Sequence, residues 1–414
     1  MEVSSSELMM FMNLIPKGGD LHNHLSGALF FEDYVNIFNK LNYCIDNSTF
    51  QVSKNYSNNC KPFKDLDTKM YNEIRKRWSI LDNKYKNENL KNFFKIFYYV
   101  RFPLDCFKEA LLIVKSRAIN ENVQYIESML DMRSIIDVDD SKNISFDFNN
   151  INILMKMFDN DSVKQSNIDQ AITTINNFNI SDNYFTVKYL ILISRTLNPY
   201  LFFEQIYYAS KIYNKSEEVV GVNVAGREDN KYSFINFDIQ MKIIKYFKDI
   251  FNLKVSIHSG ELTKKITKPE NLNHIHNSIN IAHRIGHGVD IMYEPDPINI
   301  MKTMRDKKIA VEINLSSNEF LLGIKPIDNP IKLYMKNGVP VVLSSDDPGI
   351  FMTTLSEQYY LLMKNFNLTF SELKDVIYNG ILYSFLNEKD KKEQLIILDI
   401  KFIEFEYKLK NYRI

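Results

Sequence analysis

The feature of this sequence that most constrains its fold is a repeated alternation of strand-like and helix-like segments. Eight short runs of β-branched and apolar residues recur along the chain. Most are separated by longer segments whose apolar residues recur at a spacing near 3.6, the period of an α-helix. Such alternation favours a closed parallel (β/α)8 barrel, or TIM barrel, over an open sheet. The predicted strands are Gly19–Leu25, Val123–Met129, Val187–Ser194, Val219–Val224, Leu253–His258, His283–Gly288, Ile309–Leu315 and Val339–Ser344.

The gap between the first two predicted strands is much longer than one crossover between neighbouring strands. We therefore predict a helical insertion from Phe30 to Asn122. Within it, the pattern predicts helices at Lys69–Leu81 and Leu90–Tyr99 and an exposed loop, rich in Asn and Ser, at Asp46–Asn59. An insertion after the first strand of a barrel lies on the active-site face. The helix predicted at Leu90–Tyr99 is rich in aromatic residues. It is expected to form a substrate lid or to pack on the barrel, and it can do both at once.

The charge balance and hydropathy of the chain argue against two classes of partner. The 414 residues include 51 Lys and Arg residues and 51 Asp and Glu residues. This balance gives no argument for nucleic acid or an anionic membrane as a partner. No stretch reaches the roughly 18 apolar residues of a membrane span. We expect a single barrel domain over residues 1–414 that acts on a small molecule, and the sequence carries no indication of its oligomeric state.

The N-terminus and the cysteines both favour a cytoplasmic protein. The segment Met1–Glu7 carries acids where a secretion signal has positive charges, and it is not followed by an apolar run that leads into small residues. The cysteines are sparse and odd in number: Cys44, Cys60 and Cys106. That count fits a reducing compartment without a disulfide framework. Cys44 and Cys60 flank a polar segment and could pair, but a cytoplasmic location opposes that pairing.

Histidines are few, and most of them lie at or near the ends of predicted strands. His22 and His24 are two residues apart in the first strand, so both side chains point to the same face and can reach one ion. Two polar residues at a strand end are the simpler explanation of this pair. His258 follows the fifth strand and adds a third imidazole. His287 ends the sixth strand between two glycines, where it either faces the site or caps a tight turn.

Carboxylates accompany these histidines at two strand ends. Glu261 follows His258 after a turn at Gly260, so it is placed either for proton transfer or as the first acid of a surface helix. Asp346 and Asp347 are adjacent at the end of the last strand, and such like charges repel unless a cation or donors hold them. A helix cap before a proline would explain one of the two acids. Taken together, the imidazoles and an aspartate predict one metal site at the C-terminal face of the barrel.

The order and spacing of these motifs resemble the adenosine deaminase family from Pro16 to about Phe351. The opening Lys-Gly-Gly and the run Gly226–Asp229 look nearer to the growth-factor-related and bacterial branch of that family. The matching segments are Pro16–Gly27, Gly221–Gly226, His258–Glu261, Arg284–Gly288 and Ser344–Pro348.

The resemblance implies a mononuclear zinc site and a set of catalytic residues. One Zn²⁺ per chain would be bound by His22, His24, His258 and Asp346, and Asp346 counts among the catalytic residues as well. The zinc would lower the pKa of its bound water.

Further roles follow from the same resemblance. Glu261 would protonate purine N1, and His287 would orient or deprotonate the zinc-bound water. Asp347 would bond N7, and the backbone N–H of Gly226 would meet N3.

Ser26 departs from the family pattern. The family usually has an aspartate at this position, and that acid contacts the ribose 5′-hydroxyl. Serine is shorter and uncharged, so the substrate could be a 5′-modified nucleoside or a nucleotide rather than plain adenosine. Lys17 and Arg227 are the cations nearest to the motifs in sequence, but the sequence does not place either of them at a phosphate.

We therefore expect hydrolytic deamination of adenosine or a related adenine nucleoside, with release of ammonia. The alternatives are another mononuclear amidohydrolase acting on a 5′-modified adenine nucleoside or nucleotide, and a catalytically silent deaminase-like binding protein. The His-x-Glu and Pro-Cys-x-x-Cys motifs of the zinc deaminases that edit single-stranded nucleic acid are missing from the sequence.

Overall fold

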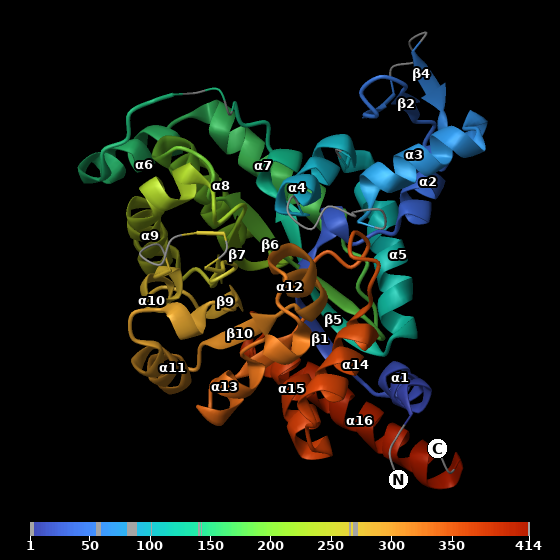
Figure 1. Ribbon diagram of the computed structural model, residues 1–414. Helices are drawn as coiled ribbons and strands as arrows, with labels where there is room; N and C mark the ends of the chain where they lie inside the picture. The colour runs from blue at the N-terminus through green and yellow to red at the C-terminus, as the bar shows by residue number, and fades with distance from the viewer. Residues whose placement is uncertain are drawn as a thin grey trace.

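A parallel barrel forms the centre of the molecule (Figure 1). The computed structural model describes residues 4–54, 59–80, 89–100, 102–139, 141, 143–264, 266–267 and 272–412. Within them, eight strands lie in the order β1-β5-β6-β7-β8-β9-β10-β11, and all pair in parallel. The strands are β1 (Gly18–His24), β5 (Val123–Asp131), β6 (Thr186–Ser194), β7 (Val219–Ala225), β8 (Val255–Ser259), β9 (Arg284–His287), β10 (Ala310–Ile313) and β11 (Val341–Leu343).

The first and last strands meet just beyond the end of β11. The backbone N–H of His24 donates to the carbonyl oxygen of Asp346 at 2.9 Å, and the N–H of Asp346 donates to that of His22 at 2.8 Å. A parallel bridge between Asn23 and Asp346 completes this contact. The prediction of a (β/α)8 barrel is therefore confirmed, and each of the eight predicted strands overlaps an observed one.

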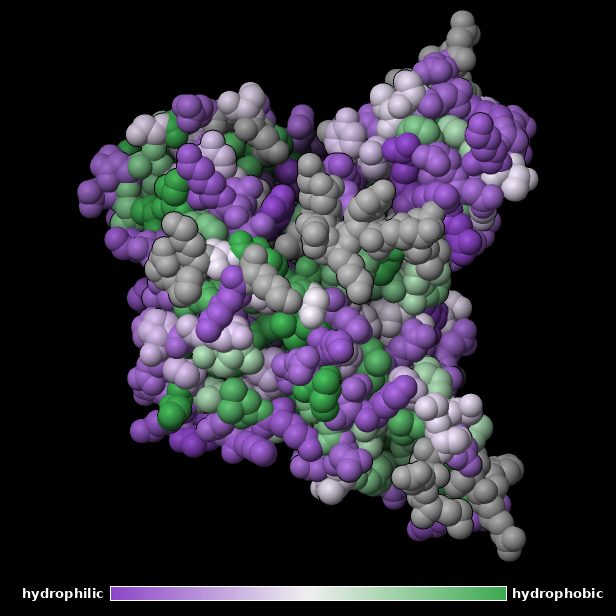
Figure 2. All heavy atoms as spheres, in the orientation of Figure 1, coloured by the Kyte–Doolittle hydropathy of each residue, from purple (hydrophilic) through white to green (hydrophobic). Residues whose placement is uncertain are grey.

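Helices surround the barrel because parallel strands are apolar on both faces and must be covered on the outside. Figure 2 shows mainly hydrophilic side chains on the outer surface, with hydrophobic ones in smaller patches between them. No helix among the described residues is long and apolar enough to cross a membrane. The helices outside the insertion are α1 (Ser5–Leu14), α6 (Ile151–Asp159), α7 (Ser162–Asn176), α8 (Pro199–Lys215), α9 (Lys231–Phe251), α10 (His274–Ser278), α11 (Pro297–Asp306), α12 (Leu315–Leu322), α13 (Ile331–Lys336), α14 (Leu355–Phe366), α15 (Phe370–Leu382) and α16 (Glu388–Tyr412).

The segment predicted as a helical insertion contains a small sheet as well as helices. Its helices are α2 (Phe31–Lys40), α3 (Thr68–Trp78), α4 (Asn89–Val100) and α5 (Phe107–Asn120), and α3 and α4 overlap the two predicted helices, although Leu81 lies outside the described residues. The strands β2 (Cys44–Asp46), β3 (Val52–Ser53) and β4 (Cys60–Pro62) form an antiparallel sheet, in which β2 and β4 flank the predicted loop and β3 lies within it. In Figure 1 this sheet projects away from the barrel.

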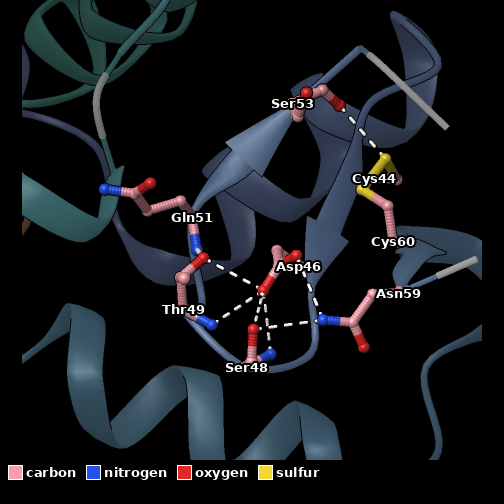
Figure 3. The surroundings of a disulfide bond; sticks show 8 residues. All are labelled: Cys44, Asp46, Ser48, Thr49, Gln51, Ser53, Asn59 and Cys60. Carbon is pink, nitrogen blue, oxygen red and sulfur yellow. Dashed lines mark hydrogen bonds between the residues drawn. A yellow bond between two sulfur atoms is a disulfide. The ribbon is translucent and has the colours of Figure 1, made fainter. Parts of the chain in front are cut away.

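A disulfide between Cys44 and Cys60 contradicts the expectation that the chain has none (Figure 3). Pairing of β2 with β4 brings the two Cα atoms to 5.5 Å, within the range that a disulfide spans. The intervening turn is stabilised by Asp46, whose Oδ1 accepts the backbone N–H of Ser48 at 2.9 Å and that of Thr49 at 2.8 Å. Cys106 is free and buried. The cytoplasmic location and the single domain over residues 1–414 stay predictions.

Replacing Cys44 and Cys60 together with serine is expected to destabilise the small sheet without changing the unfolding of the barrel. The disulfide closes a loop with a sequence separation of 16, and a loop of this size corresponds to about 3 kcal/mol of stabilisation. Limited proteolysis should cut the variant between positions 44 and 60 faster than the wild type. Equal cleavage rates for the two proteins would contradict the prediction.

A close backbone contact joins α15 to the N-terminal end of β1. A Cβ atom added at Gly19 would lie 2.5 Å from the carbonyl oxygen of Gly380, and one added at Gly380 would lie 2.6 Å from the carbonyl oxygen of Gly19. Either distance is far below van der Waals contact, so both positions need glycine. The contact fixes the position of α15 beneath the barrel.

Candidate metal centre and active site

Four predicted metal ligands converge where β1, β8 and β11 end. His22 and His24 lie on β1, His258 lies on β8, and Asp346 follows β11. The Nε2 atoms of His24 and His258 are 3.3 Å apart. Oδ1 of Asp346 lies 3.4 Å from Nε2 of His22 and 3.4 Å from Nε2 of His24. The structure thus brings together side chains that are up to 324 positions apart in the sequence.

These side chains fit a tetrahedral metal ion. Ligand atoms about 2.0–2.1 Å from a tetrahedral Zn²⁺ lie roughly 3.3 Å from one another, and the three distances above agree with that value. Nε2 of His22 is buried and has no hydrogen-bond partner among the described residues. The facing nitrogens of His24 and His258 repel each other unless a proton or cation lies between them. Imidazole and carboxylate are also the ligands that such an ion prefers.

Burial and neighbouring charges shift the pKa values of the four predicted ligands in different directions. Burial lowers the pKa of His24 to about 4, and it lowers that of His258 well below its usual value. Burial also opposes protonation of His22, but bonds to the carboxylates of Asp346 and Glu312 outweigh it and raise the pKa to about 10. The pKa of Asp346 is lowered because its contacts with the neighbouring histidines exceed the effect of burial. In the absence of a cation, the carboxylates therefore hold a proton on His22.

Glu261 lies beside the metal ligands, and its backbone is fixed by another carboxylate. The carboxylate of Glu228 accepts the backbone N–H of Gly260 at 3.1 Å and that of Glu261 at 2.8 Å. Gly260 has a φ of +77°, a conformation that favours glycine. Burial raises the pKa of Glu261 well above its usual value, and the negative charges of Asp346 and Glu228 act in the same direction. Its surroundings therefore favour the protonated form of the side chain.

His287 faces both Glu261 and the metal ligands. Its Nε2 lies 3.7 Å from Oε1 of Glu261, and its Nδ1 lies 2.9 Å from Nδ2 of Asn318 on α12. Burial lowers its pKa to about 4, so the ring is neutral at neutral pH. Since the Asn318 amide donates to Nδ1, the proton of the neutral ring lies on Nε2 and points toward Glu261.

The three predicted substrate contacts follow the C-terminal ends of β1, β7 and β11. Asp347 follows Asp346, is buried, and has an Oδ1 atom without a hydrogen-bond partner among the described residues. Burial and the charge of Asp346 raise its pKa well above the usual value. Gly226 follows β7 with a φ of +109°. Ser26 is half-buried in the short turn after β1, where its carbonyl oxygen accepts the hydroxyl of Tyr34 at 2.5 Å.

The two cations near the motifs are both engaged elsewhere. Lys17 precedes β1, at the end of the barrel opposite to the metal ligands. Its side chain is buried and donates to the carbonyl oxygens of Ile15 at 3.0 Å and Glu121 at 2.6 Å. Arg227 forms two bonds with the carboxylate of Asp229, at 3.0 and 2.7 Å. Lys17 is therefore remote from the predicted metal ligands, and Arg227 is already paired with a carboxylate.

An aromatic contact connects the insertion to the loop that carries the two aspartates. Phe93 on α4 stacks on Phe351, with ring centroids 5.4 Å apart and an angle of 10° between the planes. Phe351 also contacts Phe320 on α12 at 5.8 Å. The insertion therefore reaches the C-terminal face of the barrel, as expected for an insertion at this position.

Two buried carboxylates that support the site, Glu228 and Glu312, could not be predicted from the sequence. Glu228 lies two residues after Gly226 and also accepts a bond from Nδ1 of His274 at 2.6 Å. This bond between Glu228 and His274 could not be predicted from the sequence. Glu312 contacts His22 from the middle of an apolar strand, where nothing in the sequence marks it as part of the site. The one feature of the sequence that could have drawn notice to Glu312 is the position of a carboxylate within an otherwise apolar run.

The carboxylate of Glu228 is expected to stabilise the fold in a pH-dependent manner. Burial alone would raise its pKa, but His274, Arg195 and the backbone donors outweigh burial and lower it from 4.5 to about 2. A lowered folded-state pKa gives stabilisation that is present above pH 4.5 and lost as pH falls toward 2. Between pH 5 and pH 3.5, wild type should therefore lose about 1 kcal/mol that Glu228→Gln does not lose. Urea unfolding at pH 5 and pH 3.5 measures the difference, and parallel losses in the two proteins would contradict it.

Comparison with known proteins places the chain in a family. The adenosine deaminase family model matches residues 72–399, which include His258, Glu261, His287 and Asp346. The chain belongs to the adenosine deaminase family. An adenosine deaminase of Plasmodium falciparum is 33% identical over 162 residues, which cover 37% of this chain and 42% of that protein. The match thus spans less than half of the relative's length.

Solved structures agree with this family at the level of the fold. A Burkholderia ambifaria amidohydrolase with bound Zn has a TM-score of 0.67 at 15% identity and covers 99% of this chain and 96% of its own. The Arabidopsis protein ADAL in complex with IMP has a TM-score of 0.67 at 19% identity, covering 96% of this chain and 99% of its own. At these identities, both likenesses concern the fold alone.

Proposed function

We propose that this member of the adenosine deaminase family is a zinc-dependent enzyme that deaminates an adenine nucleoside by hydrolysis. The observation that carries the proposal is the convergence of His22, His24, His258 and Asp346, with three ligand-atom separations of 3.3–3.4 Å, beside a buried Glu261. These ligands would hold one Zn²⁺ per chain. When bound, Zn²⁺ supplies a water whose pKa is lowered to about 7.

The protein side chains divide the remaining work. Glu261, protonated because its pKa is raised, donates a proton to N1 of the purine as C6 is attacked. His287 lies close to Glu261. At this position its ring can orient the attacking water and exchange a proton with that water. Ammonia then leaves and the 6-oxo product remains. The family match and the presence of a complete set of side chains favour this reaction over a catalytically silent binding protein.

Substrate contacts follow from the strand ends around the metal site. Asp347, whose raised pKa lets it carry a proton, would donate to purine N7, and the backbone N–H of Gly226 would meet N3. Stacking of Phe93 on Phe351 supports the role of the insertion, residues 30–122, as a lid over this pocket.

A second candidate substrate is a 5′-modified adenine nucleoside or a nucleotide. Ser26 offers a short, uncharged side chain where the family usually has aspartate, and a solved neighbour of the same fold is a complex with IMP. Against a nucleotide stand the positions of Lys17 and Arg227, which bond to protein oxygens. An uncharged 5′ substituent is therefore favoured over a phosphate.

A substrate panel tests the proposal directly. Ammonia release is measured with adenosine, 2′-deoxyadenosine, 5′-methylthioadenosine, AMP, N6-methyl-AMP and guanine. We expect activity on adenosine or 5′-methylthioadenosine and little on AMP. If zinc-loaded protein released ammonia from none of these compounds, the proposed function would be wrong. A Ser26→Asp variant should shift preference toward the free 5′-hydroxyl.

A further inference from the structure

A carboxylate beneath the candidate metal centre contacts one of its ligands. Glu312 lies on β10 inside the barrel and is fully buried. Its Oε2 lies 2.7 Å from Nδ1 of His22, the ring nitrogen opposite to the one that faces Asp346. Its Oε1 accepts Nε of Arg284 at 2.5 Å and the hydroxyl of Ser256 at 3.0 Å. Both carboxylate oxygens of Glu312 are therefore engaged by donors from three other strands.

Arg284 extends this network across the barrel. Its Nη2 donates to the carboxylate of Glu127 on β5 at 2.5 Å. Its guanidinium also lies 3.7 Å from the ring centroid of Phe385, and the backbone N–H of Phe385 donates to Glu127 at 2.5 Å. Phe385 follows α15, so the network runs from the C-terminal part of the chain to His22. Every charged side chain in it is buried.

Fold stability alone does not account for this arrangement. Buried ion pairs are costly to desolvate, and apolar side chains of similar volume commonly replace them without loss of stability. The network has two carboxylates and one guanidinium, so one negative charge remains after pairing. That charge faces Nδ1 of His22. Metal-bound histidines commonly donate their second ring N–H to such a carboxylate, which fixes the tautomer and the ring orientation.

We propose that Glu312 is the positioning residue for His22, held in place by Arg284 and Glu127. The inference rests on the metal site of the proposed function. Glu312 holds the proton of the neutral His22 ring on Nδ1 and directs the lone pair of Nε2 toward His258 and Asp346. Arg284 and Ser256 prevent the carboxylate from turning away.

The variant Glu312→Gln reverses this tautomer. Arg284 donates to Oε1 of Glu312, and the Ser256 hydroxyl lies nearer to Oε1 (3.0 Å) than to Oε2 (3.2 Å), so the amide oxygen of glutamine is held on the side of Arg284. Its NH₂ group then faces Nδ1 of His22, which has to accept. The ring proton moves to Nε2, and the lone pair that would bind the ion is lost.

Zinc affinity, measured by competition with a chromophoric chelator, tests the proposal without using activity. We expect Glu312→Gln to bind Zn²⁺ about 10- to 100-fold more weakly than wild type. The visible spectrum of the Co²⁺-substituted variant should also change, because the ligand geometry changes. The matched control is Glu204→Gln. It alters a buried carboxylate that lies on the outer helix α8 and pairs with Lys164 on α7. It should keep the wild-type affinity and spectrum.

Ser256→Ala provides a second variant that removes one hydrogen bond and no charge. It should weaken zinc binding by about fivefold, the equivalent of one hydrogen bond, and it decides the question if Glu312→Gln does not fold. Wild-type affinity in a folded Glu312→Gln, or in Ser256→Ala if the first variant is unfolded, overturns the proposal. If the wild type binds one zinc but deaminates none of the compounds, the proposed function is overturned. The comparison of zinc affinities between wild type and variants still tests the role of Glu312 in that case. Wild type that binds no zinc overturns both.

Discussion

Glu261→Gln is expected to lower kcat by a factor of about 10²–10⁴, the usual contribution of a general acid. An amide has the shape of the carboxylic acid but cannot give its proton to N1 of the purine. The backbone N–H of residue 261 still donates to Glu228, so the loop keeps its position. Zinc content should therefore remain at one per chain. Steady-state ammonia release and elemental analysis of the same sample measure both quantities.

A buried carboxylate outside the site serves as the control for this variant. Glu294 is buried, and it accepts backbone N–H groups of Ile275 at 2.7 Å and His276 at 3.3 Å. Glu294→Gln should keep kcat near the wild-type value. Normal turnover by zinc-loaded Glu261→Gln would show that another group protonates the substrate.

Removal of the metal is expected to abolish deamination and to destabilise the protein. Without a cation, the facing nitrogens of His24 and His258 and the buried carboxylate of Asp346 lose their common partner. An ion present at 1,000 times its dissociation constant stabilises the folded state by about 4 kcal/mol. Dialysis against a chelator should therefore reduce activity to background and lower the melting temperature.

Titration back with Zn²⁺ distinguishes this enzyme from other barrel hydrolases. Activity and melting temperature should both be restored at one equivalent per chain, whereas a binuclear amidohydrolase would need two. Full activity in a sample shown to be free of metal would refute the proposed chemistry. The matched metal for the control titration is Mg²⁺, which prefers oxygen ligands and should restore neither property.

The barrel could be predicted from the sequence because its signals are local. Each parallel strand is a short apolar run, and the periodic segments between strands form the outer helices. The positions of His22, His24 and His258 at strand ends predicted that they would meet, since parallel strands in a barrel end on one face. Alternation along β1 predicted that its two histidines share a side, as they do in the structure.

Other features could not be predicted because they depend on contacts between distant segments. Glu312 lies within an apolar strand, and its bond to His22 follows only from the register of the closed barrel. The bond between Cys44 and Cys60 depends on a small sheet with short, polar strands that resemble a loop in composition. The N-terminal residues and the cysteine count served to predict the cellular location of the protein. Neither of them carries information about that sheet.

The contact between Gly19 and Gly380 limits how this chain can diverge. A methyl group on either residue would force α15 away from the floor of the barrel. The segment just after α15 supplies the carbonyl of Tyr383 to Arg284 and the N–H of Phe385 to Glu127. Alanine at either glycine would therefore disturb the surroundings of the metal site from the opposite end of the barrel. It would do so even though every predicted metal ligand is unchanged in the sequence.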